Sequence, residues 1–174
     1  MDELNKYSLS IIKKNKEINL ISSSTEKSIN TRHITDSAQT IDFIDKNDVN
    51  ICTDLGSGAG LPGIVLAILM KPKKPQFKVI FYEKSYHKSN FLKEISRKFK
   101  LNTEINQKNI FDQKNLQTDI IISRAFKPLQ VIFEIALNNF KKFKYIILFL
   151  GKSEKEILKE SSKKWKFDYE KKKS

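Results

Sequence analysis

Residues 54–63 read Asp-Leu-Gly-Ser-Gly-Ala-Gly-Leu-Pro-Gly and contain four of the five glycines in the chain. A strand candidate over 50–55 precedes the cluster, and an apolar run over 64–70, suited to a buried helix, follows it. Glycines in such a turn permit positive φ angles and let a ligand approach the backbone without meeting a Cβ. The order of strand, glycine turn and helix is typical of a nucleotide-binding βαβ unit.

Strand and helix patterns go on alternating after this unit. Further strands are predicted over 77–83, about 102–107, 119–123 and 145–151, and further helices over 85–100 and 129–140. The continuous apolar character of the 119–123 segment is typical of a strand covered on both faces. We therefore predict an open, mainly parallel α/β sheet with helices on both faces, that is, a Rossmann-like fold.

The length of 174 residues suits one domain of ordinary size. We predict a single domain, 1–174, in which a helical N-terminal extension (1–48) precedes a cofactor-binding core (49–151). A basic C-terminal segment (152–174) follows and begins with a charged helix candidate. No internal repeat or linker is evident.

Charge and composition narrow the class of protein. The 33 Lys+Arg outnumber the 20 Asp+Glu, giving a formal net charge of +13, which predicts a polyanionic partner or reflects a general lysine bias. No apolar run approaches the roughly 20 residues of a membrane helix, and the N-terminus lacks a signal-peptide core, so we expect a cytoplasmic protein without membrane contact. The single cysteine, Cys52, and the isolated His33 and His87 offer no disulfide and no metal-ligand spacing, so we expect no metal.

The glycine turn matches two ligand patterns. Read from Gly58, it is the dinucleotide fingerprint G-x-G-x-x-G. Read from Asp54, it is acidic-x-G-x-G-x-G, the pattern of enzymes that use S-adenosylmethionine, a cationic ligand that suits an acidic residue. Glu83, at the end of the second strand, is placed to accept the ribose hydroxyls of either nucleoside.

Four segments together resemble the bacterial 16S rRNA guanine-N7 methyltransferase family, RsmG, also called glucose-inhibited division protein B. They are the turn 54–64 with its Leu-Pro-Gly extension, Asn19-Leu20-Ile21 with Arg32-His33-Ile34-Thr35-Asp36-Ser37, Phe91-Leu92, and Ser123-Arg124-Ala125-Phe126. The resemblance covers about residues 15–151. It implies the class I methyltransferase fold, S-adenosylmethionine as cofactor and methylation of guanine 527 in the 530 loop of 16S rRNA.

The family pattern also implies site residues. By the resemblance, S-adenosylmethionine would be bound by Gly56, Leu61, Glu83, Ile110, Phe111 and Arg124. Our interpretation of the turn itself adds Asp54, Gly58 and Gly60 as cofactor-binding residues. The chain departs from the pattern at Phe111, where the family often has an acidic residue, and at Leu150, for which Lys152 would substitute. The family also closes its sheet with a pair of strands, for which this chain offers one candidate, 165–169.

Arg124 is the predicted positioning residue at the mouth of the site, and no general base is expected because guanine N7 carries a free lone pair. Arg32, His33 and Asp36 either fold over the cofactor or lock the N-terminal helices to the core. Lys88 and the other lysines of 85–100 and 141–173 either bind RNA phosphates or form a solvated face.

The expected partner is 16S rRNA, alone or within the small ribosomal subunit or its precursor, and we expect a monomer. Two other functions stay open: a nicotinamide-dependent oxidoreductase that uses Gly58, Gly60 and Gly63, and a catalytically silent RNA-binding domain of the same fold.

Overall fold

The fold is built on a five-stranded sheet. The computed structural model describes residues 2–151 and 153–172. The strand order is β3-β2-β1-β5-β7, and every neighbouring pair is parallel. The strands are β1 (Ile51–Leu55), β2 (Lys78–Tyr82), β3 (Thr103–Asn106), β5 (Ile120–Arg124) and β7 (Tyr145–Phe149). The predicted parallel α/β sheet is confirmed, and each strand lies close to its predicted bounds.

The strand order reverses beside β1. The chain runs from β1 through β2 to β3 and then returns to β5 on the other side of β1. Open parallel sheets bind ligands at the carboxyl ends of their strands, where the order reverses. The glycine turn follows β1 and Arg124 ends β5, so both lie at this edge.

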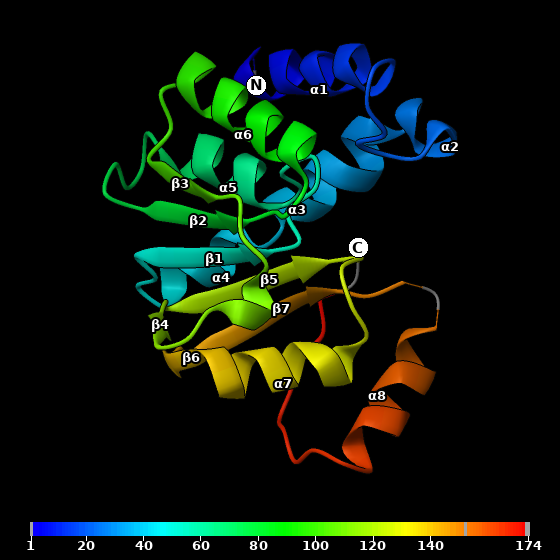
Figure 1. Ribbon diagram of the computed structural model, residues 1–174, viewed down its shortest axis with the longest axis vertical. Coiled ribbons are helices and arrows are strands. Elements are labelled where there is room, and N and C mark those ends of the chain that lie inside the picture. Colours follow the sequence, from blue (N-terminus) through cyan, green and yellow to red (C-terminus); the bar gives the residue numbers. More distant parts are fainter. Residues whose placement is uncertain (1, 152, 173–174) are drawn as a thin grey trace.

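Helices cover both faces of the sheet (Figure 1). α1 (Asp2–Asn15), α5 (Gly63–Met70) and α6 (Tyr86–Lys98) lie on one side, and α7 (Leu129–Asn139) lies on the other. The strand β5 shows why both faces need cover. Its residues Ile120 and Ile122 join the buried cluster beneath α5 and α6, whereas Ile121 joins the cluster beneath α7.

The N-terminal extension is helical, as predicted. After α1 come α2 (Ser23–Glu26), a π-helical turn η1 (Asn30–Thr35), α3 (Asp36–Ala38) and α4 (Ile41–Lys46). Tyr7 and Ile11 of α1 are fully buried in the main core cluster. The extension is therefore packed as part of the core and contributes to the layer that covers α5.

The C-terminal segment differs from the prediction. The charged helix is present as α8 (Glu154–Ser162), but the strand expected over 165–169 is wrong, because residues 163–172 form neither strand nor helix. Trp165 and Phe167 pack instead on Phe133 of α7, with ring centroids 5.8 and 5.0 Å from it. Their alternation therefore reflects packing on a helix and gives no strand at the sheet edge.

Three small elements lie outside the prediction. A single 3-10 turn, η2 (Ile110–Asp112), follows β3, and a short second sheet pairs β4 (Leu116–Gln117) with β6 (Phe140–Lys142). Cys52 is buried in the core, as predicted. Within the described residues, no helix has the length and apolar character needed to cross a membrane, and no three His, Cys, Asp or Glu side chains gather as metal ligands would.

Candidate functional site

The glycine turn is fastened to the neighbouring strand at its start. The N–H groups of Gly56 and Ser57 donate to the carbonyl of Tyr82 at the end of β2, at 3.0 and 3.4 Å. The Ser57 hydroxyl donates back to the carbonyl of Asp54 at 2.9 Å. These bonds fold the chain sharply between β1 and α5, so that the turn sits across the carboxyl ends of β1 and β2.

Gly56 and Gly58 are glycines for different reasons. Both have positive φ, +67° and +55°. A Cβ on Gly56 would lie 2.0 Å from Cδ2 of Phe126, so the ring of Phe126 already fills that space. A Cβ on Gly58 would meet only the Gly56 carbonyl oxygen, at 3.9 Å. The backbone at Gly58 is therefore open to an approaching ligand, whereas at Gly56 it is covered by protein.

Asp54 lies beneath the turn. Asp54 is 1% exposed, and its Oδ2 accepts a hydrogen bond from the Gly63 N–H in the first turn of α5, at 3.0 Å. Burial raises the pKa of Asp54 to about 7; the bond from Gly63 opposes this rise and the charge of Glu83 adds to it. We expected this carboxylate to face a cationic ligand, and the structure shows it capping the start of α5 from the strand end.

Glu83 joins the turn to the start of α6. Its Oε2 accepts from the Gly58 N–H and its Oε1 from the Ser85 N–H, each at 2.8 Å. The residue is 8% exposed. Each carboxylate oxygen has a second acceptor position, so Glu83 can also receive two hydroxyl donors from a ligand lying over Gly58. The structure thus brings Glu83 and Gly58 together at the start of α6.

Ile110 and Phe111 lie in the turn η2 after β3. The side chain of Ile110 is buried, whereas Phe111 is 42% exposed. The turn is held from below by Asn139, a buried residue of α7 whose amide donates to the carbonyls of Ile110 at 2.8 Å and Gln113 at 2.5 Å. Sequence reasoning missed Asn139. Its signal was a polar residue among the apolar positions of the 129–140 helix.

Arg124 connects the sheet to the N-terminal extension. Its guanidinium pairs with Asp36 at 3.3 Å and lies over the ring of Phe149, 5.3 Å from the centroid. Burial lowers the pKa of Arg124, while the charge and hydrogen bond of Asp36 act in the opposite direction. Arg124 and Asp36, predicted as separate site residues, are therefore brought together. The contact favours the predicted locking of the N-terminal helices to the core.

The other predicted site residues that the structure describes lie in the core, in the N-terminal extension and on α6. Leu61 is 7% exposed within the main core cluster, and Gly60 is backed by Ile64 and Leu92. His33 is half-buried in η1, and Lys88 lies in the first turn of α6. The side chain of Arg32 and the whole of Lys152 lie outside the described residues.

Sequence reasoning also missed two contacts to the turn. The buried hydroxyl of Tyr7, in α1, donates to the carbonyl of Ala59 at 2.8 Å. Phe126 reaches Gly56 because Ala125, between it and Arg124, has a positive φ of +51°. Both contacts join segments far apart in the chain, and local patterns give no signal for them.

Comparison with known proteins identifies the family. The chain is 50% identical over 162 residues to the ribosomal RNA small subunit methyltransferase G of Pelagibacter ubique, covering 92% of this chain and 76% of the relative. Among solved structures, cofactor-bound Rv0187 from MTB shares 10% identity, with a TM-score of 0.65 over 94% of this chain and 77% of its own. A protein assigned as an O-methyltransferase from Klebsiella pneumoniae also shares 10% identity, with a TM-score of 0.57 over 78% and 59%.

The two structural likenesses support the predicted methyltransferase-type fold, and the sequence match extends through the glycine turn and Glu83. The model of the family GidB, described as rRNA small subunit methyltransferase G, matches residues 1–174. With this match and the 50% identical relative, the chain belongs to the rRNA small subunit methyltransferase G family.

Proposed function

We propose that this protein transfers a methyl group from S-adenosylmethionine to N7 of a guanine in 16S rRNA. The observation that carries the proposal is the pairing of Gly58 and Glu83. The backbone of Gly58 is open on the side where a Cβ would project, and its N–H holds the Glu83 carboxylate at 2.8 Å. An adenosine can therefore lie against the turn with its ribose hydroxyls on Glu83.

The residues present fit the donor. Gly58 offers the uncovered backbone, Glu83 the acceptors, and η2 a turn with Ile110 buried beneath and Phe111 exposed. Membership of a methyltransferase family favours this ligand over a nicotinamide cofactor. It also favours an active enzyme over a silent RNA-binding domain, because the turn and the carboxylate are both intact.

When bound, S-adenosylmethionine supplies an electrophilic methyl group on a sulfonium, which the N7 lone pair takes up as the sulfur–carbon bond breaks. No proton leaves N7 before this attack, so the chain's contribution is to hold the reactants in line and exclude water. Asp54 serves this task indirectly, because its bond to Gly63 fixes where the turn enters α5.

Arg124 acts as a positioning residue in this proposal. Its pair with Asp36 fastens η1 and α3 to the end of β5, at the edge where the turn lies. The pair therefore holds segment 30–38 at the same edge of the sheet as the glycine turn. N7 of a paired guanine lies in the major groove of A-form RNA, which is too deep and narrow for protein side chains to enter. The target base must therefore be unstacked or exposed.

Guanine 527, in the 530 loop, is the proposed target, and the small subunit or its precursor is the proposed setting, with the protein acting as a monomer. The test is transfer of a labelled methyl group to in vitro transcribed 16S rRNA and to purified small subunits lacking the modification. The proposal expects label in RNA from one or both substrates. Absence of label from both, with folded protein and intact RNA, would contradict it.

A further inference from the structure

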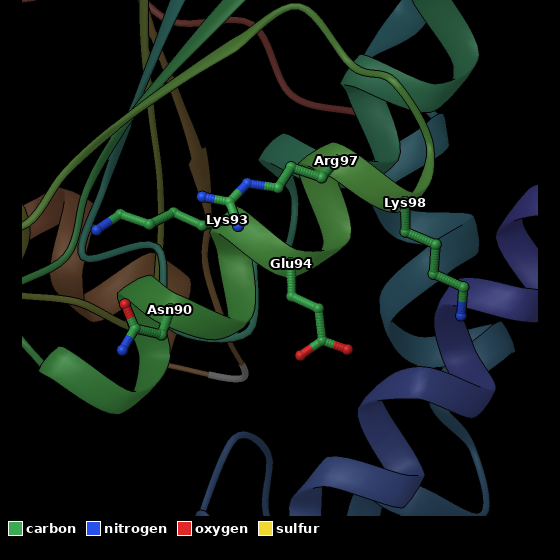
Figure 2. A pocket seen from close by; sticks show the side chains of 5 residues that line it. All are labelled: Asn90, Lys93, Glu94, Arg97 and Lys98. Carbon is green, nitrogen blue, oxygen red and sulfur yellow. The ribbon is translucent and has the colours of Figure 1, made fainter.

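One exposed face of α6 carries an aromatic ring followed by polar and basic side chains. Positions 86, 90, 93 and 97 are spaced four, three and four residues apart, so they share one face of the helix. They hold Tyr86, Asn90, Lys93 and Arg97, which we call the α6 stripe. In Figure 2, Lys93 and Arg97 extend to the same side of α6 above Asn90.

The stripe begins at the candidate donor site. The Glu83 carboxylate that receives the Gly58 N–H also receives the N–H of Ser85, which precedes Tyr86. The ring is therefore close in the chain to the carboxylate that would hold the donor's ribose. From Tyr86 to Arg97 the stripe then runs along the helix for roughly 16 Å.

The aromatic end of the stripe is exposed. Tyr86 is 60% exposed, and its ring meets that of the exposed His87 edge to face, with centroids 5.5 Å apart. The neighbouring Lys84 is exposed as well. An exposed ring with a cation beside it is an arrangement with which proteins stack bases of single-stranded RNA while contacting the backbone.

The basic end borders a hollow on the surface. The hollow has a volume of about 510 Å3 and is lined by Asn90, Lys93, Glu94, Arg97 and Lys98. Lys98 turns toward α1 and donates to the Ser10 hydroxyl at 2.9 Å (Figure 2). Within residues 2–151 and 153–172, neither Lys93 nor Arg97 forms an ion pair, so both cations are available to a phosphate.

The apolar side of α6 argues against a membrane as the partner. A helix that lies on a membrane inserts its apolar side into the lipid. Here Phe91, Leu92 and Ile95 are buried in the core of the protein. Beside the stripe, α6 also exposes His87, Glu94 and Lys98, so the outer side of the helix is polar and carries more cations than anions, which suits RNA.

We propose that the α6 stripe is the RNA-binding surface of this protein, on which Tyr86 stacks against an unpaired base while Lys93 and Arg97 contact phosphates. The inference rests on the proposed function and deepens it, because it specifies how the RNA is led to the donor site. The stripe requires unpaired RNA at its Tyr86 end, which agrees with the need for an unstacked guanine.

The stacking step is tested with Tyr86→Ala and Tyr86→Phe, and Tyr169→Ala serves as the matched control because Tyr169 is similarly exposed, at 63%. Binding of a fluorescein-labelled single-stranded RNA of 20 nucleotides is measured by anisotropy. We expect Tyr86→Ala to weaken binding at least fivefold, and the other two variants to stay within twofold of wild type. Equal affinity of Tyr86→Ala and wild type would overturn the inference.

The phosphate contacts are tested by salt dependence. The double variant Lys93→Ala/Arg97→Ala should reduce the slope of log K against log salt by one to two, whereas Tyr86→Ala should leave the slope unchanged. Lys155→Ala/Lys159→Ala removes the same charge from α8 and is the control. If both double variants reduce the slope equally, the stripe contributes no more to RNA binding than other surface lysines, and the inference fails.

The outcomes separate this inference from the proposed function. If wild type transfers no methyl group but Tyr86→Ala still loses RNA affinity, the proposed function fails and the stripe stands. If wild type methylates 16S rRNA and Tyr86→Ala binds RNA normally, only the stripe fails. The inference would also be overturned if Tyr86→Ala weakened binding to phosphatidylglycerol vesicles but left binding to RNA unchanged.

Discussion

Replacing Asp54 by asparagine should change how the stability of the protein depends on pH. The folded state raises the pKa of Asp54 from 3.8 to about 7, chiefly through burial. Between these two pH values the folded state holds a proton that the unfolded state has lost, so the free energy of unfolding falls as pH rises. At about 1.4 kcal/mol per pH unit, the full decrease is about 4 kcal/mol, a large share of a typical domain's stability.

The amide introduced by Asp54→Asn does not titrate, yet its oxygen can still accept the Gly63 N–H. The assay is urea unfolding of wild type and Asp54→Asn at pH 5, 6, 7 and 8 and constant ionic strength. The difference in unfolding free energy between the two proteins cancels all other titrating groups. It should move in favour of Asp54→Asn by roughly 2–3 kcal/mol from pH 5 to pH 8, with most of the change below pH 7. A difference that stays within about 1 kcal/mol over this range would refute the assignment of a raised pKa to buried Asp54.

Three further variants probe the site and its supports. Gly58→Val should abolish binding of S-adenosylmethionine in calorimetry, as should Gly58→Asn, which tolerates the positive φ. Normal binding by both variants would show that S-adenosylmethionine does not lie on this turn. Arg124→Ala should reduce methyl transfer to 16S rRNA at least tenfold, which corresponds to about 1.4 kcal/mol of activation free energy, because η1 and α3 lose the ion pair between Arg124 and Asp36. Unchanged turnover would show that Arg124 does not act at the site. Asn139→Ala should lower the free energy of unfolding by about 1–3 kcal/mol, because the buried carbonyl of Ile110 and the partly buried carbonyl of Gln113 lose their hydrogen-bond donor. Replacing the exposed Asn138 by alanine should change it little.

The glycine turn and the parallel strands could be predicted because each produces a recognisable pattern within a short stretch of sequence. Four glycines within ten residues have few uses other than a ligand turn, and continuous apolar segments such as 119–123 require cover on both faces. Glu83 followed from the same logic, since the carboxyl ends of neighbouring parallel strands meet at one edge. In the structure, the Glu83 carboxylate accepts the Gly58 N–H at 2.8 Å.

What could not be predicted depends on contacts between distant segments. Tyr7 bonds to Ala59 across 52 positions, and Asn139 to Ile110 across 29, and neither pairing leaves a periodic pattern. The partner of the Asp54 carboxylate could not be predicted either, because a carboxylate at a strand end can bind a ligand or accept an N–H at the start of the next helix. Near the C-terminus, the alternating aromatic residues predicted a strand. In the structure, Trp165 and Phe167 pack on Phe133 of α7 instead.

The central claim is that the site formed by Gly58 and Glu83 directs methyl transfer to guanine N7. The most direct measurement is mass-spectrometric mapping of methylated nucleotides in 16S rRNA incubated with the protein and isotope-labelled S-adenosylmethionine, with Gly58→Val in parallel. We expect one labelled 7-methylguanine, in the 530 loop, made by wild type and absent with Gly58→Val. Label on another atom or base, or label that persists with Gly58→Val, would contradict the claim.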